Sequence, residues 1–356
     1  MSMKIAMIGF GGVGQAFAEI VEEKHQELQQ NYGLDVEIVA ISDVMKGSIF
    51  QPDGLNITKV LECVKQTGSV ETYPSSSQTV KGWNSVETIE KSQADVIIEV
   101  TYTDVKTGEP ALTHCHRAFE TGKSVITTNK GPVALAYQEL TEKANEHEVF
   151  FGFEGTVMSG TPALRLPLET LAGNEIKEIR GILNGTTNYI LTAMESGMTL
   201  NQALEKAQAL GYAEADPTSD IEAYDVRYKA AILSNHVYGV HLDPDDIFCA
   251  GITGLTVEDI KEAEKAGEKW KLLARISQDN GSVKAIVRPE RVKKDDLLAR
   301  VNGATNAIVY ECDLSGPIML TGAGAGLKET GFSLLIDLIH CHKQKQVAKI
   351  GGGSHS

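Results

Sequence analysis

Three things are scarce in this sequence: cysteine, long apolar runs and basic charge. The five cysteines are widely spread, odd in number and without a CxxC spacing, so we expect no disulfide framework and a reducing, cytoplasmic location. No run approaches the ~18 apolar residues of a membrane span, and a strand-like run begins at residue 3, which leaves no room for a signal peptide. Lysine and arginine total 33 against 48 acidic residues, a net charge of −15, so neither nucleic acid nor an anionic membrane surface is expected as a partner.

What is present describes a globular chain long enough for two domains. Its 356 residues are 42% hydrophobic, which suffices for a sizeable core. The acidic balance still permits a phosphorylated small molecule as ligand, because such a ligand needs only a few local groups. Residues 351–356, rich in glycine and serine, are expected to form a flexible tail.

The first 150 residues alternate short apolar runs with longer helical patterns. The runs are rich in valine and isoleucine and apolar on both faces, which is typical of parallel strands covered on both sides. This alternation predicts the α/β class, with a Rossmann-type doubly wound parallel sheet. The expected strands are 4–9, 36–42, 95–100, 124–127 and 148–152, and the expected helices are 14–28, 58–66, 109–121 and 134–145.

The pattern changes after about residue 155, where strands and long helices are mixed. A strand is expected at 176–183, and a helix at 199–211 begins with a capping-box sequence at Thr199. A further helix is expected at 219–238. Near the end, the glycine cluster 322–326 precedes another helical pattern. This mixture predicts a second domain of the α+β class.

The segment 9–14, GFGGVG, lies between an expected strand and an expected helix. Glycines in this position allow a tight turn and let backbone N–H groups meet a pyrophosphate at the helix N-terminus. A GxGxxG match alone is weak, but its place after the first strand predicts a dinucleotide site. Asp43 ends the second expected strand, where a carboxylate can accept a hydrogen bond from the adenosine ribose. The alternative is a solvated loop aspartate.

Two further segments carry lysines. Lys130 lies in TTNKGP, at the C-terminal end of an expected strand, which is the edge where open α/β sheets bind ligands. Asp225 and Lys229 are four residues apart on an expected helix and share a face. The lysines could serve proton transfer, with carboxylates holding an ammonium group. The alternatives are a surface lysine and an exposed ion pair.

Glu154 stands beside a loop of small residues at 155–162. A carboxylate together with backbone carbonyls can bind a monovalent cation, because oxygen ligands suit hard cations. Two His-Cys-His triplets, at 114–116 and 340–342, resemble zinc ligands. Alternate residues of a helix point to different faces, so shared zinc coordination is not expected there.

Taken together, these segments resemble homoserine dehydrogenase, and the resemblance spans nearly the whole chain. The matching segments follow the family's order, and those beginning at residues 183 and 207 are specific to it. They are GFGGVG at 9–14, TNKGP at 128–132, EGTVMSGTP at 154–162, LNGTTNYIL at 183–191, AQALGYAEADPTSDIEAYDVRYK at 207–229 and GAGAG at 322–326.

The resemblance implies NAD(P)-dependent interconversion of L-homoserine and L-aspartate 4-semialdehyde, a small-molecule reaction on the route to threonine, methionine and isoleucine. It implies a short form of the enzyme, without the C-terminal ACT regulatory domain of many relatives, and a homodimer built on the second domain. The expected domains are a dinucleotide-binding domain at 1–135, completed by 310–350, and a substrate-binding and dimerisation domain at 136–309.

The resemblance also implies roles for particular residues. Lys130 and Lys229 would be catalytic, and Glu214 and Asp225 would hold the amino end of the substrate. Thr186 would lie near the nicotinamide. A sodium or potassium ion would bind the Glu154 side chain and the carbonyls of Val157, Ser159 and Thr161. The expected cofactor-binding residues are Gly9, Phe10, Gly11, Gly12, Val13, Gly14, Asp43, Thr101, Lys130, Thr186 and Gly324.

Some positions depart from the family's pattern. Thr128 stands where alanine is common, Ala223 where glycine is common, and Gly331-Phe332 where small residues usually follow a threonine. Two alternatives therefore remain: a related dehydrogenase acting on another amino-acid semialdehyde or hydroxy acid, and a non-catalytic NAD(P)-binding homologue. The intact lysines and carboxylates count against the second alternative.

Overall fold

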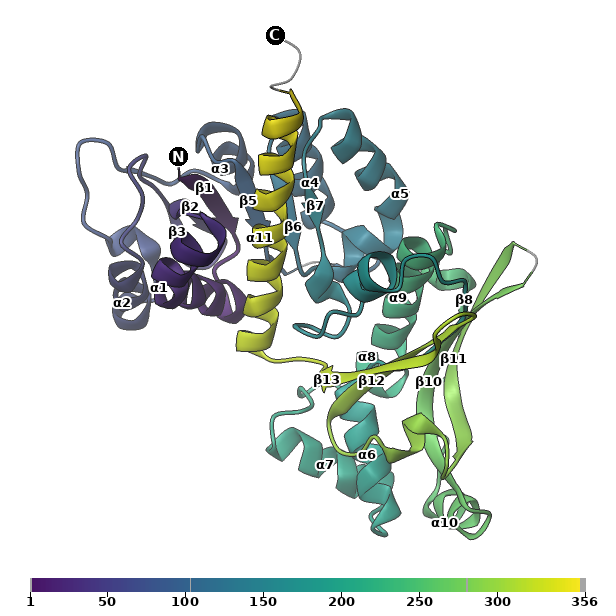
Figure 1. The fold of residues 1–356 in the computed structure, drawn as a ribbon. Coiled ribbons are helices and arrows are strands. Elements are labelled where there is room, and N and C mark those ends of the chain that lie inside the picture. Colours follow the sequence, from purple (N-terminus) through teal and green to yellow (C-terminus); the bar gives the residue numbers. More distant parts are fainter. Residues whose placement is uncertain (1, 103, 280, 353–356) are drawn as a thin grey trace. The chain divides into compact units, whose positions relative to one another are not determined.

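The computed structural model describes residues 2–102, 104–279 and 281–352, and the chain divides into two compact units (Figure 1). Unit 1 comprises Met1–Thr156 and Leu327–Ser356, and unit 2 comprises Val157–Gly326. The limits expected from the sequence, 135 and 310, fall inside helix α5 (Lys130–Glu146) and strand β12 (Thr305–Cys312). The observed limits lie instead after the short turn that ends at Thr156 and before the helix that begins at Leu327, because α5 and β12 each pack within a single unit.

A seven-stranded sheet forms the centre of unit 1, in the order β4-β3-β2-β1-β5-β6-β7. The expected doubly wound sheet is confirmed: β2, β1, β5, β6 and β7 run parallel, and the antiparallel strands β3 and β4 extend one edge. The strands are β1 (Met3–Ile8), β2 (Val36–Asp43), β3 (Gly47–Phe50), β4 (Val80–Lys81), β5 (Val96–Glu99), β6 (Ser124–Thr127) and β7 (Phe151–Gly152).

Helices cover both faces of this sheet, because successive residues of its central strands point to opposite sides. Ile5 and Met7 of β1 join a core with α1, α2 and α11, while Ala6 and Ile8 join a second core with α3, α4 and α5. The helices are α1 (Gly12–Tyr32), α2 (Ile57–Thr67), α3 (Ser85–Lys91), α4 (Ala111–Glu120), α5 and α11 (Leu327–Gly352), with short turns η1 (Val70–Thr72) and η2 (Glu154–Thr156).

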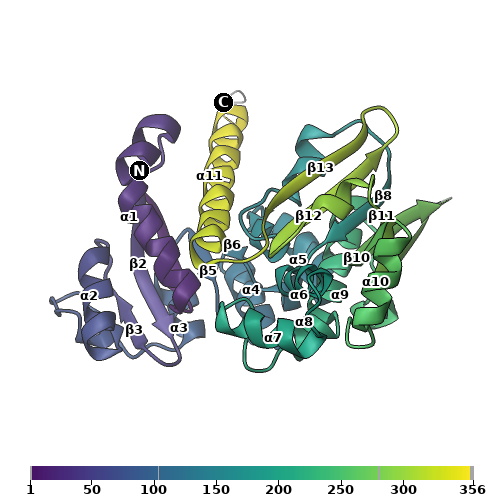
Figure 2. The same cartoon turned by 90° about the horizontal axis from the view of Figure 1, so that it is seen from below.

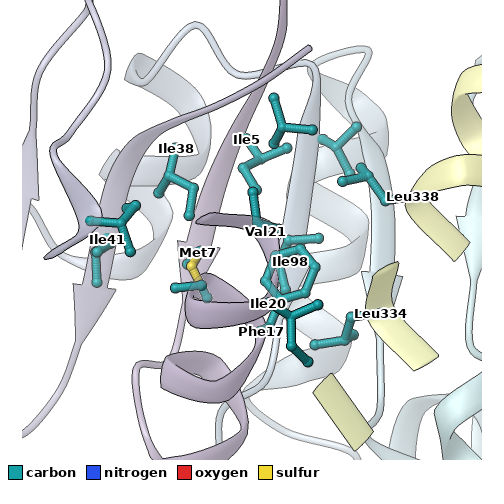
Figure 3. Close-up of a cluster of buried hydrophobic side chains, with 14 of the residues drawn as sticks. Ile5, Met7, Phe17, Ile20, Val21, Ile38, Ile41, Ile98, Leu334 and Leu338 are labelled. Atoms are coloured by element: carbon teal, nitrogen blue, oxygen red, sulfur yellow. The ribbon is translucent and has the colours of Figure 1, made fainter. Parts of the chain in front are cut away.

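The last helix, α11, returns to unit 1 and completes its core. Leu334 and Leu338 pack in the same cluster as Phe17 and Ile20 of α1 (Figure 3). Gly331 lets the two helices approach closely, since a Cβ built there would lie 3.1 Å from the Phe17 backbone nitrogen. Of the expected tail 351–356, residues 351 and 352 belong to α11, and 353–356 lie outside the described residues.

A six-stranded mixed sheet forms the centre of unit 2, in the order β13-β12-β8-β10-β11-β9. Its longest part is the antiparallel hairpin of β10 and β11, which pairs twelve residues with twelve. Figure 2 shows α10 beside this hairpin, and α6 and α9 also pack on β10. The strands are β8 (Ile176–Ile182), β9 (Phe248–Cys249), β10 (Glu268–Asp279), β11 (Ser282–Lys293), β12 and β13 (Gly316–Ala323).

The helices of unit 2 correct one expectation and confirm another. The expected single helix at 219–238 is wrong, because Ala223 has a φ of +66°, which no helix interior accommodates. The expected capping box is present: Thr199 accepts from the Gln202 N–H, and the Gln202 side chain accepts from the Thr199 N–H. The helices are α6 (Gly185–Glu195), α7 (Leu200–Ala209), α8 (Thr218–Ile221), α9 (Tyr224–Leu233) and α10 (Val257–Lys265), with short turns η3 (Leu166–Thr170), η4 (Ser234–Tyr238), η5 (Pro244–Asp246) and η6 (Leu297–Arg300). Within the described residues, no helix is both long and apolar enough to cross a membrane.

Candidate functional site

The glycine-rich turn between β1 and α1 has two glycines that the fold itself requires. Gly9 has a φ of +94°, and a Cβ there would lie 2.5 Å from the Val100 carbonyl oxygen. A Cβ on Gly14 would lie 2.9 Å from the Gly9 carbonyl oxygen. Gly11 differs, because a Cβ there would meet nothing within 4 Å. The space above Gly11, at the N-terminus of a 21-residue helix, therefore fits a close approach by a pyrophosphate.

The other residues of this turn pack against the core of unit 1. Phe10 is fully buried, and Val13 packs against the core of unit 1. Gly12 is the first residue of α1, and a Cβ there would lie 2.8 Å from the end of the Leu327 side chain.

Asp43 is the last residue of β2 and is bonded to the same turn. Its Oδ2 accepts from the Phe10 N–H at 2.7 Å, and its Oδ1 accepts from the Met45 and Lys46 N–H groups at 2.9 Å each. Its side chain is only 11% exposed, so Asp43 is not the solvated loop aspartate of the alternative interpretation. A carboxylate oxygen can accept a second hydrogen bond, so the placement is compatible with the predicted ribose contact.

The C-terminal edge of the same sheet carries Thr101 and Lys130. Lys130 is the first residue of α5 and directly follows β6 and a two-residue turn. The Thr101 hydroxyl donates to Glu99, a fully buried carboxylate at the end of β5 that the sequence analysis did not single out. The sequence does indicate such a residue, because a glutamate at the end of a run of buried aliphatic residues needs hydrogen-bond partners.

In unit 2, the expected pair of Asp225 and Lys229 forms and is buried. The Lys229 ammonium donates to Asp225 Oδ2 and to the Leu183 carbonyl oxygen, both at 2.7 Å. Asn184, which caps α6, donates to Asp225 Oδ2 at 3.1 Å and to Asp220 Oδ1 at 2.7 Å. The Lys229 side chain is only 8% exposed, so the alternative of an exposed surface pair does not hold.

Two carboxylates therefore lie beside one lysine. Burial raises the pKa of Asp220, and the negative charge of Asp225 raises that pKa further, while the hydrogen bond from Asn184 opposes the shift. Thr186 stands at the start of α6, and its hydroxyl donates to the Tyr212 carbonyl at 2.6 Å. Carboxylates of this kind can accept hydrogen bonds from a cationic amino group.

Glu214, the other expected substrate ligand, lies exposed in the loop between α7 and α8. Its backbone carbonyl accepts from Gln208, but within the described residues its carboxylate makes no hydrogen bond or ion pair. The structure therefore does not join Glu214 to the Asp225–Lys229 pair by contact. A conformation in which it turns towards a bound substrate would be needed for the predicted role.

The segment proposed for a cation crosses the limit between the units. Glu154, in unit 1, is buried, and its N–H donates to Asp337. In unit 2, Val157 and Ser159 are buried, Ser159 has a φ of +53°, and the Thr161 carbonyl accepts from the Ala163 N–H at 2.7 Å. In the part of the chain that the structure describes, no group of three or more His, Cys, Asp or Glu side chains is placed to hold a metal ion.

Gly324, the last expected cofactor residue, lies against the buried Asn306. A Cβ on Gly324 would lie 2.1 Å from Asn306 Nδ2, so only glycine fits there without movement. Both polar atoms of the Asn306 side chain are buried and without a hydrogen-bond partner among the described residues.

A doubly wound sheet whose first turn is open to a pyrophosphate, joined to a unit that buries a lysine beside carboxylates, defines a two-domain dinucleotide-dependent dehydrogenase. The homoserine dehydrogenase family model matches residues 162–339, and the NAD(+)-dependent homoserine dehydrogenase of Pseudomonas canavaninivorans is 42% identical over 341 residues, 96% of each chain. The chain belongs to the homoserine dehydrogenase family, as its motifs predicted.

Other relatives agree with this assignment. The homoserine dehydrogenase of Methanocaldococcus jannaschii is 41% identical over 96% of this chain and 98% of its own. The structure of a hyperthermophilic archaeal homoserine dehydrogenase mutant in complex with NADPH matches with a TM-score of 0.83 and 30% identity, over 97% of this chain and 98% of that one. Residues 1–111 also match the family model of glutamate/leucine/phenylalanine/valine dehydrogenase.

Proposed function

We propose that this protein is an NAD(P)-dependent oxidoreductase that interconverts L-homoserine and L-aspartate 4-semialdehyde. The observation that carries the proposal is the ion pair of Asp225 with the buried Lys229 on α9, in a chain that matches homoserine dehydrogenases over nearly its whole length. The related-dehydrogenase alternative has less support, because the glutamate/leucine/phenylalanine/valine dehydrogenase model matches residues 1–111 alone, whereas the homoserine dehydrogenases named above match nearly the whole chain.

Reduction of the aldehyde produces an alkoxide, so the site needs a donor aimed at the developing negative charge. Bound NAD(P) supplies the hydride. Within the described residues, Lys229 uses two of its three N–H donors, on Asp225 and Leu183, so the third is available to the alkoxide. In the oxidative direction, a neutral lysine accepts the hydroxyl proton. Lys130, on unit 1, is the second lysine proposed for this proton transfer.

The carboxylates of unit 2 are proposed to hold the amino end of homoserine. Asp225 and Asp220 share the Asn184 amide, so two carboxylates lie together at one place in unit 2. An ammonium group bound to them would hold the hydroxyl end in a fixed orientation. Glu214 is proposed to join them when substrate is bound.

The glycine-rich turn is proposed to hold the cofactor pyrophosphate, with Asp43 on the adenosine ribose. The open space above Gly11 fits this group, and Thr101, Thr186 and Gly324 remain proposed contacts. A carboxylate suits a free ribose hydroxyl and repels a 2′-phosphate, so we propose NAD as the preferred cofactor.

Four further properties implied by the family resemblance are also proposed: a role in amino-acid biosynthesis, a homodimer built on unit 2, a cytoplasmic location, and a bound sodium or potassium ion. Free thiols at all five cysteines support a reducing compartment. The ion would use the Glu154 carboxylate and the Val157, Ser159 and Thr161 carbonyls. Light scattering of the purified protein tests the dimer, and activity in sodium, potassium or neither tests the ion.

The decisive experiment assays purified protein with homoserine and other hydroxy acids, using NAD and NADP in turn. We expect turnover with homoserine, and Lys229→Ala should lower kcat by about 10²-fold or more because alkoxide stabilisation is lost. Cofactor affinity should change little in this variant. Cofactor binding without turnover of any hydroxy acid would instead favour the non-catalytic homologue, and preference for another hydroxy acid would favour the related dehydrogenase.

A further inference from the structure

A buried carboxylate links the end of β5 to the start of α5. Glu99 is the last residue of β5 and is fully buried. A buried carboxylate is costly unless hydrogen bonds and nearby charge compensate it. Its partners are Thr101, His114, Thr127 and Asn129, which together with Glu99 and Ser85 we name the Glu99 cluster.

Each oxygen of Glu99 accepts from a group that can only donate. Oε1 accepts from the Thr101 backbone N–H at 3.3 Å as well as from its hydroxyl, and Oε2 accepts from the Asn129 side-chain amide. The Thr127 hydroxyl lies 3.2 Å from Oε2. An ionised carboxylate, which only accepts, satisfies this set of donors.

His114 holds the carboxylate from the neighbouring helix α4. Its Nδ1 lies 3.2 Å from Glu99 Oε1, and its Nε2 lies 2.9 Å from the Ser85 hydroxyl at the start of α3. Both ring nitrogens therefore have partners. Because an ionised carboxylate can only accept, the Nδ1–H group of His114 is the donor to Glu99.

The cluster ends at the residue before Lys130. The Asn129 N–H donates to the Thr127 hydroxyl at 3.0 Å while the Asn129 amide donates to Glu99. These bonds fix the turn from β6 into α5, and with it the direction in which the first residue of α5 leaves the sheet. The same carboxylate fixes the turn after β5 through Thr101.

We propose that Glu99 and His114 are positioning residues for Lys130. The carboxylate orients the turn that carries the lysine, and the histidine orients the carboxylate. This inference rests on the proposed function, because it concerns one of the two lysines assigned there to proton transfer. Neither Glu99 nor His114 needs to contact substrate or cofactor for this role.

Glu99→Gln tests the carboxylate with almost no change of shape. A glutamine places an NH₂ group among donors, so the turn before Lys130 should loosen and kcat should fall about tenfold or more. The KM for homoserine should change much less, because the proposed substrate ligands belong to unit 2. Ser124→Ala is the matched control: Ser124 is a buried residue at the other end of β6 that accepts from the Phe150 N–H. It should lower the melting temperature but leave kcat unchanged.

Two variants of His114 test the same proposal if Glu99→Gln fails to fold. In His114→Asn the side-chain amide can still donate to Glu99, and most of kcat should remain. In His114→Phe that donor is lost, and kcat should fall as in Glu99→Gln. Equal kcat in the asparagine and phenylalanine variants, or wild-type kcat in Glu99→Gln, would overturn the proposal.

A third readout does not depend on turnover. The rate at which an amine-acylating reagent modifies Lys130, measured by peptide mass spectrometry, should change in Glu99→Gln and stay unchanged in Ser124→Ala. Unchanged Lys130 reactivity in both variants would overturn the positioning role. Wild-type protein that fails to oxidise homoserine, with Lys130 reactivity altered by Glu99→Gln, would overturn the proposed function and leave the positioning role standing.

Discussion

Lys271 of β10 is a fully buried lysine that no proposed catalytic step uses. Its ammonium donates to the Asn188 side-chain oxygen at 3.1 Å and to the Val301 carbonyl, and so ties α6 to the segment before β12. Burial lowers its pKa to about 8, with the nearby Lys269 adding to the shift and Glu195 opposing it. The neutral amine keeps two N–H donors, so both bonds can survive deprotonation.

This lysine should make unfolding depend on pH in a defined window. Its pKa is about 8 when folded and 10.5 when unfolded, so between these values the unfolded chain binds more protons and the free energy of unfolding rises with pH. The rise from this group is about 3 kcal/mol at ~1.4 kcal/mol per pH unit. Urea unfolding at pH 7 and pH 10 should show this increase in the free energy of unfolding in the wild-type protein and not in Lys271→Met.

The half-buried Lys269, which pairs with Glu195 at 2.7 Å, provides the control. Lys269→Met should reduce the dependence on pH without abolishing it, because Lys269 supplies only part of the shift in the Lys271 pKa. If wild type and Lys271→Met show parallel pH dependence, Lys271 is not the group that titrates.

At the scale of single elements, the turn between β1 and α1 contains glycines that the fold requires and one glycine, Gly11, that it does not. Gly9→Ala should lower the melting temperature, because it combines a φ of +94° with a clash against the Val100 carbonyl. Gly11→Ala should leave the melting temperature unchanged, because the added methyl group meets nothing within 4 Å. It should nevertheless weaken cofactor binding, since that methyl group would occupy the space proposed for the pyrophosphate.

Thermal unfolding and cofactor titration of the two variants check this expectation. Gly11→Ala with wild-type cofactor affinity would place the pyrophosphate away from this turn. A lowered melting temperature in Gly11→Ala would mean that the open space is filled in the folded protein.

The elements also show what the sequence could predict. The parallel strands of unit 1 were predictable because they are apolar on both faces, as in β1 and β5. The hairpin of β10 and β11 was not, because charged residues such as Arg275 and Arg291 interrupt its apolar pattern and bond across the sheet to glutamates. The break at Ala223 was also hidden, since alanine gives no signal of a left-handed conformation.

The candidate site was also predictable from the sequence only in part. The pairing of Asp225 with Lys229 follows from their spacing on one helix. Its burial does not, because Leu183 and Asn184 lie more than 40 residues away in sequence. Glu99 was missed for a similar reason: its partners come from separate elements that only the folded sheet brings together.

At the scale of the whole molecule, unit 2 is inserted into unit 1 through two crossings, at 156/157 and 326/327. Within unit 2 both ends lie close together, since the Thr161 hydroxyl donates to the Ala323 carbonyl at 3.4 Å. Within unit 1 the two chain segments that flank the insertion are also close, because a Cβ on Gly155 would lie 2.2 Å from the Ser333 hydroxyl. Each unit has its own sheet and core.

We therefore expect unit 1 to fold when residues 157–326 are replaced by a short Gly-Ser linker. The shortened protein should unfold cooperatively and still bind NAD, because the glycine-rich turn proposed for the pyrophosphate belongs to unit 1. It should have no dehydrogenase activity, because the proposed catalytic Lys229 is removed. Circular dichroism melting and calorimetric titration with NAD measure this. Absence of a cooperative transition would show that unit 1 depends on unit 2 for stability.

The place of α11 in the core of unit 1 has a consequence for biosynthesis of the chain. A ribosome releases residues 1–156 long before it releases Leu334 and Leu338, which fill the space beside Phe17 and Ile20. Until then only α1 and α2 cover that apolar face of the nascent sheet, whereas unit 2 has all of its strands once residue 326 has emerged. We expect the inserted unit to reach its native state first, so the part of the chain that is translated first waits for the part that is translated last.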